Sequence, residues 1–163
     1  MRIVPEVRRL PSSYASAIGR VLARWSYEEW LLERILYRLL AVDPRRAGKA
    51  VRALRPDERV AMIRDLVKAR GLAVAGEYSR MKTGLRRAKA ERDLLAHGLW
   101  LRHPETGRLH IWWMGRRRAA GAKARPIPKT ARDLRATYRE LDRLIALTRR
   151  MEKDVTAALR ARR

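Results

Sequence analysis

The chain contains no cysteine. Disulfide bonds, iron–sulfur clusters, thiolate zinc sites and cysteine nucleophiles are therefore excluded. The fold is expected to be held together by packing, and a length of 163 residues suits one domain with one core. We therefore treat residues 1–163 as a single domain.

Long uncharged segments are also absent. The longest stretch without Asp, Glu, Lys or Arg runs only from Leu10 to Gly19, whereas a membrane-spanning helix needs about 18 or more apolar residues. Near the N-terminus, Pro5, Glu6 and Arg8 stand where a secretory signal would have its apolar region. We therefore expect a protein without membrane contact that stays in the cytoplasm.

Acidic residues are few relative to basic ones. The chain has 17 Asp and Glu against 40 Lys and Arg, a net charge of +23. A polyanion is the expected partner of such a chain. Most of the cations are arginines, whose planar guanidinium binds phosphate as a fork, and this favours nucleic acid. The alternative is that scattered arginines simply coat the helix faces, and composition leaves it open.

Hydrophobic periodicity predicts an all-α fold, an up-and-down bundle of four to five helices. Residues 1–25 are expected to hold an N-terminal helical extension. A capping box of Ser26 and Glu29, flanked by Trp25 and Trp30 as a hydrophobic staple, predicts a kink or restart there. Further helices are predicted at residues 26–41, 44–54, 56–71, 77–97 and 130–159.

After Gly98 the apolar spacing changes from helical to alternating. This change predicts a two-stranded β-hairpin inserted at residues 99–114, with Pro104 and Gly107 in its turn. The three tryptophans of the hairpin could stack on unpaired bases, but packing against the helices is the favoured interpretation. A small hairpin of this kind needs such packing, because a two-stranded ribbon is only marginally stable alone.

A basic segment follows the hairpin. Residues 115–128 contain Arg116, Arg117 and Arg118 and no acidic residue. We predict that this segment is a mobile basic loop, able to reach phosphate groups.

The sequence contains no metal-binding motif and no nucleotide-binding motif. The three histidines, His97, His103 and His110, are too few and wrongly spaced for a metal-binding helix. The glycines never form a phosphate-binding or dinucleotide-binding motif. We therefore predict no metal and no cofactor.

One motif remains, at the end of the predicted helix 77–97. The residues Arg92-Asp93-Leu94-Leu95-Ala96-His97 are followed by a glycine. They resemble the R-x4-H motif of HEPN-domain proteins, a large set of prokaryotic and eukaryotic ribonucleases and toxins. The resemblance extends more weakly to the helix layout of residues 26–163, whereas the hairpin and the basic loop lie outside the minimal family pattern.

The resemblance implies a metal-independent endoribonuclease, a toxin or defence effector that acts as a homodimer. An antitoxin or a nucleotidyltransferase is then a candidate partner. By resemblance, two copies meet across the helix face that carries the motif, so that two such motifs share one cleft. Arg92 lies on the side of Ala88 and Leu95, where an ordinary surface arginine is unexpected unless that apolar stripe forms an interface.

The residue types suit RNA cleavage. A 2′-hydroxyl can attack the adjacent phosphorus once it loses its proton, which leaves a 2′,3′-cyclic phosphate and a 5′-hydroxyl. His97 is suited to proton transfer because an imidazole titrates near neutral pH, and Arg92 supplies a permanent charge to the phosphorane. Asp93 can orient either of them. The side chains expected to hold flanking phosphates are Arg86, Arg87, Lys89, Arg116, Arg117 and Arg118.

Other interpretations stay open. Arg92 and Asp93 could form a surface ion pair, with His97 favoured at a helix end by the helix dipole. The chain would then be a non-catalytic nucleic-acid-binding dimer. A third hypothesis is an interaction protein, similar to an antitoxin, whose charge serves an acidic partner.

Overall fold

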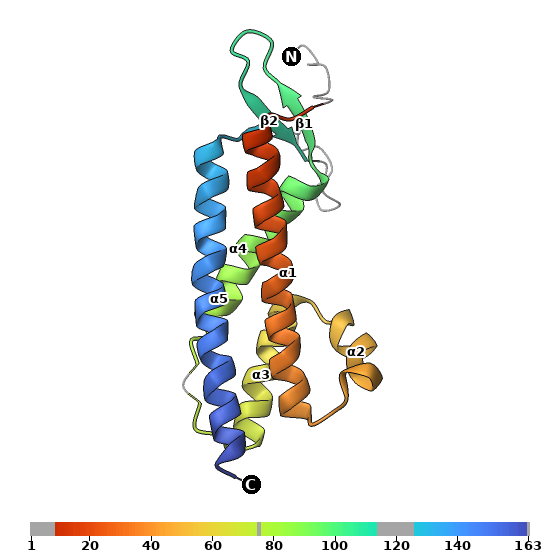
Figure 1. The fold of residues 1–163 in the computed structure, drawn as a ribbon, viewed down its shortest axis with the longest axis vertical. Coiled ribbons are helices and arrows are strands. Elements are labelled where there is room, and N and C mark those ends of the chain that lie inside the picture. Colours follow the sequence, from red (N-terminus) through yellow and green to blue (C-terminus); the bar gives the residue numbers. More distant parts are fainter. Residues whose placement is uncertain (1–8, 75, 114–125, 163) are drawn as a thin grey trace, which may run out of the picture.

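The computed structural model describes residues 9–74, 76–113 and 126–162. These ranges form a bundle of helices with a small sheet at one end (Figure 1). The helices are α1 (Ser12–Leu40), α2 (Pro44–Ala53), α3 (Pro56–Ala69), α4 (Tyr78–His97) and α5 (Ala131–Arg160), and the strands are β1 (Leu99–Arg102), β2 (Leu109–Trp112) and β3 (Ile127–Pro128). The predicted helical bundle with an inserted hairpin is confirmed.

The first helix is continuous, and the predicted kink or restart at Ser26 is wrong. The hydroxyl of Ser26 donates to the carbonyl of Leu22, 3.1 Å away, as a serine inside a helix does. Val21, Trp25 and Leu32 lie on one buried face that runs past this point. Burial of that face outweighs the local capping signal. Residues 12–25 therefore belong to α1 and are not a separate extension.

The staple predicted around Ser26 is also wrong. Trp25 is buried, with 2% of its surface exposed, whereas Trp30 is 45% exposed. In a continuous helix two residues five positions apart point about 140° apart. The two indole rings therefore lie on different sides of α1 and do not pack on each other.

The two long helices α1 and α5 run side by side in the same direction (Figure 1). Near the middle of each helix, Arg24 pairs with Asp142 at 3.1 Å. Further along both helices, Arg34 pairs with Glu152 at 2.8 Å. Helix α4 runs the other way, because Met81 lies beside Met151 whereas Glu91 pairs with Lys129.

Helices α2 and α3 are joined to α1 through one buried arginine. Arg59 of α3 is 4% exposed and pairs with Glu33 of α1 at 3.3 Å. It also donates to the carbonyl of Arg52 at the end of α2, 3.1 Å away. The start of α2 is capped, since the carboxylate of Asp43 accepts from the backbone N–H of Arg45.

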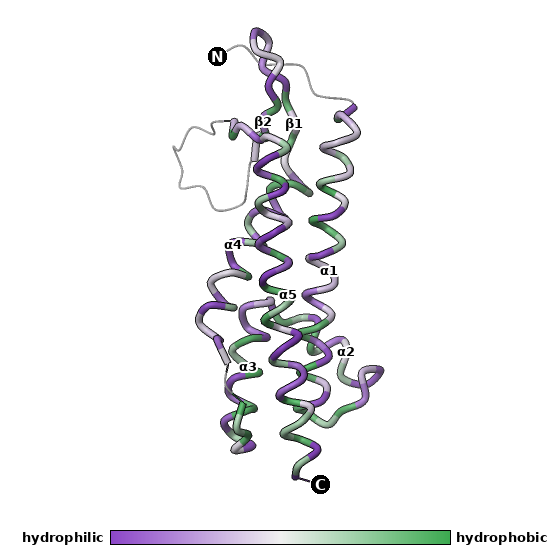
Figure 2. The backbone as a smooth tube through the Cα atoms, turned by 60° about the vertical axis from the view of Figure 1, so that its left-hand side comes forward, coloured by the Kyte–Doolittle hydropathy of each residue, from purple (hydrophilic) through white to green (hydrophobic). Residues whose placement is uncertain are grey.

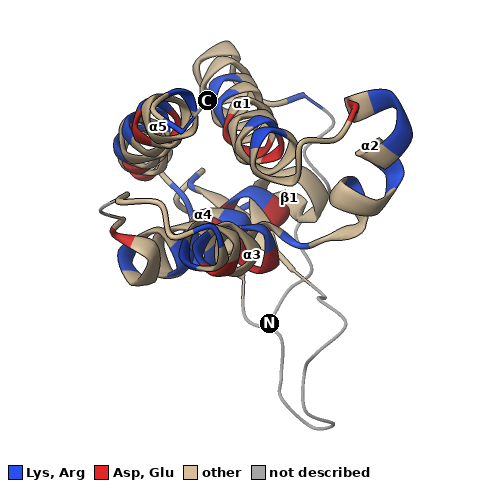
Figure 3. Cartoon of the chain, turned by 90° about the horizontal axis from the view of Figure 1, so that it is seen from below, with Lys and Arg blue, Asp and Glu red and all other residues tan. Residues whose placement is uncertain are grey.

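The core lies where α1, α3, α4 and α5 face one another. Hydrophobic and hydrophilic residues alternate along both long helices, as expected of amphipathic helices (Figure 2). The largest fully buried apolar side chains are Leu31, Leu32, Ile35, Leu36, Leu39, Ile63, Met81, Leu85, Ile111, Leu134 and Leu141. Lysines and arginines lie on the surfaces of all these helices (Figure 3).

The sheet contains one strand that the sequence did not predict. β1 and β2 pair antiparallel as expected, and Gly107 in their turn has a φ of +65°, which suits glycine. Beyond them, Ile127 and Pro128 pair with β2 as a short edge strand, a position that tolerates proline. The end of the predicted loop 115–128 is therefore a strand, and residues 114–125 lie outside the described residues.

Within the described ranges, no helix is both long enough and apolar enough to span a bilayer.

Among the described residues, one carboxyl group is fully buried, and it lies between the two long helices. Glu28 of α1 has 0% of its surface exposed, and its Oε1 lies 2.5 Å from the hydroxyl of Thr148 on α5. That hydroxyl also lies 3.1 Å from the carbonyl of Leu144. The Thr148 hydroxyl has only one hydrogen to donate. It donates that hydrogen to the Leu144 carbonyl when Glu28 is protonated and itself donates to the Thr148 oxygen. Burial raises the pKa of Glu28 to about 7, although the Thr148 hydrogen bond lowers it.

This raised pKa predicts a pH dependence of stability. Between about pH 4.5 and 7 the unfolded chain loses the Glu28 proton while the folded chain keeps it. The free energy of unfolding should therefore fall by about 3 kcal/mol as the pH rises through that range. Urea unfolding at several pH values measures this, and Glu28→Gln should remove the fall.

The matched control is Glu29→Gln, the next residue of α1, which is not fully buried. It should keep the pH dependence of the natural chain. An identical slope in the Glu28→Gln and natural proteins would contradict a buried, protonated carboxyl at this position.

Candidate active site

The motif lies in the last two turns of α4, where the helix meets the hairpin. The backbone N–H of Gly98 donates to the carbonyl of Leu94 at 3.0 Å, and β1 begins at the next residue. Gly98 has an ordinary φ of −77°, so it is not needed for a left-handed turn. A Cβ there would lie 2.1 Å from Cγ2 of Ile111 and 2.5 Å from the Leu94 carbonyl oxygen. Glycine is thus needed because the hairpin packs directly on the helix end.

Arg92 is held by two neighbours. Its guanidinium carbon lies 5.2 Å from the centre of the Trp25 ring on α1, a cation–π contact. Its Nη1 lies 2.7 Å from Oδ1 of Asp93, and 23% of the side chain is exposed. Its Nε is buried without a hydrogen-bond partner among the described residues. The guanidinium is therefore fixed in orientation, with one part still open to solvent.

The apolar stripe beside Arg92 is covered within the chain itself. Ala88 and Leu95 are each 3% exposed and belong to the common core. Trp25 explains why the arginine between them is half-buried. The stripe therefore needs no second copy to cover it, which corrects the reason given from the sequence for an interface on this face.

His97 is exposed at the end of α4. Its ring stacks on that of Trp113, with centroids 6.1 Å and planes 27° apart. Among the described residues its ring nitrogens make no hydrogen bond, so they are open to a ligand. His97 is the last residue of α4, the same helix that carries Arg92. The two side chains therefore point about 140° apart around α4.

Asp93 is turned toward cations. Besides Arg92 it contacts the Nζ of Lys89, one turn earlier on α4. The sequence left open whether Asp93 orients Arg92 or His97, and in the structure its carboxylate contacts Arg92. The three side chains together carry two positive charges and one negative charge, a net charge of +1.

The six predicted phosphate contacts have four different outcomes. Arg86 pairs with Asp57 of α3 at 3.3 Å, and it lies about 120° from Arg92 around α4. Arg87 is exposed, and Lys89 belongs to the Asp93 cluster. Arg116, Arg117 and Arg118 lie outside the described residues. Of the three predicted contacts that the structure describes, only Lys89 is in direct association with the motif.

Sequence reasoning missed both aromatic neighbours of the motif. Trp25 was assigned to a staple, and Trp113 to general packing. Trp113 is indeed packed against the core, but its ring also stacks on the ring of His97. The other predicted packing residue, Trp100, is 8% exposed. The spacing of Trp25 on the buried face of α1 was the available signal that it could meet α4.

Comparison with protein-family models, with curated proteins and with solved structures found no match. The resemblance to HEPN-domain proteins therefore stays a prediction from the sequence. The described residues hold no group of three or more His, Asp or Glu side chains that could bind a metal ion. What the site offers is an exposed imidazole, a held guanidinium and a carboxylate that holds it.

The close contact at Gly98 predicts that this site depends on glycine. Gly98→Ala should lower the free energy of unfolding by about 1 to 3 kcal/mol, because the new methyl group meets a backbone oxygen that cannot turn away. Urea unfolding measures the change. Gly19→Ala is the matched control, since no atom lies within 4 Å of its added Cβ, and it should instead stabilise α1 by about 0.5 to 1 kcal/mol. Equal stability of Gly98→Ala and the natural chain would contradict the packing described.

Proposed function

We propose that the chain is a metal-independent endoribonuclease, a toxin or defence effector of the HEPN type. The observation that carries the proposal is the presence of a fixed guanidinium and an open imidazole in the last two turns of the same helix. Arg92 is held by Trp25 and Asp93, and His97 is exposed on the last turn. The net charge of +23 supports a polyanionic substrate.

In the proposed reaction the imidazole of His97 takes the proton of an RNA 2′-hydroxyl. The oxygen attacks the adjacent phosphorus, and the guanidinium of Arg92 stabilises the negative phosphorane. The bond to the 5′-oxygen then breaks, and that oxygen takes up a proton. The products are a 2′,3′-cyclic phosphate and a 5′-hydroxyl. Asp93 acts by holding Arg92 in place.

Two copies of the chain suit this chemistry better than one. The reaction needs both a proton acceptor and a proton donor, and each motif contains one histidine. Arg92 and His97 of one chain also point about 140° apart. A phosphate lying between two copies can meet Arg92 and both copies of His97, one as base and one as acid. We therefore propose that the active form is a homodimer.

The proposal predicts that His97→Ala abolishes cleavage. RNA is incubated with chelator and the new ends are analysed. The natural chain should leave cyclic phosphate ends, and His97→Ala should be at least about 100-fold slower, because it lacks the group that transfers the proton. The control is His103→Ala, a histidine in the hairpin turn, which should cleave at the natural rate.

Arg92 requires a second readout because it also contacts Trp25. Arg92→Lys keeps the charge but loses the planar stacking, so its rate and its unfolding midpoint are measured together. Slow cleavage by a stably folded Arg92→Lys protein supports the proposed role. Equal cleavage by all variants would reject it. Salt-dependent binding that survives His97→Ala, without cleavage by any variant, would identify a non-catalytic nucleic-acid-binding protein.

The dimer is tested separately. Sedimentation at micromolar concentration should give about twice the chain mass of 19.0 kDa. A strict monomer that still cleaves RNA would contradict the two-copy site while leaving the ribonuclease proposal in place.

A further inference from the structure

A row of aromatic and arginine side chains lies on the outer surface of α1 and α5. The rings of Tyr27 and Trp30 stack, with centroids 5.4 Å and planes 28° apart. The guanidinium of Arg34, one turn further along α1, lies 4.5 Å from the centre of the Trp30 ring. Arg149 of α5 lies 5.2 Å from the centre of the Tyr27 ring and donates to its hydroxyl. An arginine therefore lies at each end of a stacked pair of aromatic rings on this surface.

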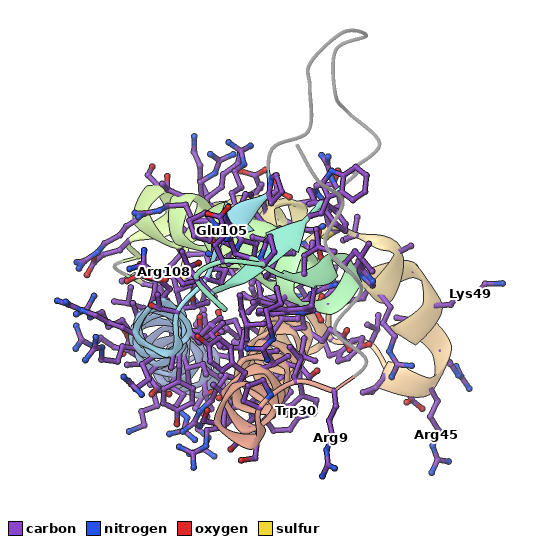
Figure 4. All side chains as sticks on the ribbon, turned by 90° about the horizontal axis from the view of Figure 1, so that it is seen from above. Arg9, Trp30, Arg45, Lys49, Glu105 and Arg108 are labelled. Atoms are coloured by element: carbon purple, nitrogen blue, oxygen red, sulfur yellow. The ribbon has the colours of Figure 1, made fainter. Side chains whose placement is uncertain are left out.

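Trp30 is the most exposed of the large hydrophobic side chains described, at 45%. Figure 4 shows it at the outer surface of α1. The Trp30 ring does not pack in the core, because the buried face of α1 is on the side of Trp25, about 140° away around the helix. With arginines beside it, an exposed indole offers a flat surface on which an unpaired base can stack.

A basic groove continues from this row along the C-terminal halves of α1 and α5. Its lining residues are Arg34, Arg38, Glu152, Lys153, Thr156, Ala157 and Arg160. Glu152 pairs with Arg34 at 2.8 Å and with Arg38 at 3.3 Å. Four cations against one carboxylate give the groove a net charge of +3. The groove therefore offers positive charge to an extended polyanion.

We propose that this surface, defined by Trp30 and the basic groove, binds single-stranded RNA. An unpaired base stacks on Trp30, and the following phosphates lie along the groove cations. A base presents a flat π face that matches an indole, whereas a duplex keeps its bases stacked inside. The proposal stands apart from the proposed cleavage, since it uses the opposite side of α1 from the Trp25 and Arg92 contact.

Arg34 has a defined part in this binding. It covers the Trp30 ring in the free protein, and an exposed cation–π contact is weaker than stacking of a base on an aromatic ring. A base can therefore take its place on the indole. The displaced guanidinium remains beside Glu152 and Arg38, close to the phosphate of the bound nucleotide.

The test measures binding of a labelled oligoadenylate of about 12 nucleotides by fluorescence anisotropy. All variants carry His97→Ala and chelator is present, so that cleavage does not enter the result. Trp30→Ala should weaken binding about tenfold, and Trp30→Phe, which keeps a flat ring, should restore most of it. Met62→Ala is the matched control, because Met62 is an exposed apolar residue of α3, and it should bind as the parent does.

The charge part of the proposal has its own pair of variants. Lys153→Ala should reduce the salt dependence of binding by about 0.7 in the logarithmic slope, whereas Lys49→Ala, on the outer side of α2 (Figure 4), should not. Binding by Trp30→Ala equal to that of the parent would overturn the proposal. Equal weakening for single-stranded and duplex RNA would also overturn it, because stacking of an unpaired base would then have no part. Failure here leaves cleavage by His97 untouched, and loss of the cleavage proposal leaves this test valid.

Discussion

The parallel packing of α1 against α5 is the constraint on which the rest of the structure depends. Two parallel helices cannot be joined by a short turn, because the C-terminus of the first lies a full helix length away from the N-terminus of the second. The chain between them must return along the bundle, over about 40 Å or more for helices of this length. Helix α4 provides this return and runs antiparallel to α5. Its C-terminal end, with the motif, is therefore placed beside the hairpin and the start of α5.

Much of this arrangement could be predicted from local signals. The cap at Asp43, the proline that opens α3 and the Thr130 and Asp133 capping box all act within one helical turn, and the structure has each of them. Such signals depend on neighbours in the sequence. They fail where distant packing competes, as at Ser26, where the buried face of α1 continues through a good capping sequence. β3 was missed because two residues carry no periodicity.

The candidate site was predictable in its residue types but not in its geometry. The spacing of the motif identified Arg92, Asp93 and His97, and the glycine after His97 predicted the end of the helix. Trp25 is far from Arg92 in sequence, so the contact that holds the guanidinium appears only when α1 and α4 are packed together. That contact also explains why an arginine is tolerated between Ala88 and Leu95. A planar cation can lie on an indole while its stem fills apolar space, which a lysine does less well.

The distribution of the few acids determines what the many cations can do. Several carboxylates form ion pairs with nearby basic side chains: those of Glu33, Asp57, Asp93 and Glu152. These ion pairs hold neighbouring helices and side chains in place. The excess of basic residues then falls on exposed faces, which are open to a polyanion. Charge alone attracts any nucleic acid and specifies no position on it. In the two proposals, position is supplied by the groups that are fixed or flat: Arg92 against Trp25 on one side of α1, and Trp30 on the other. A single helix thus separates the place where chemistry is proposed from the place where an unpaired base would be held.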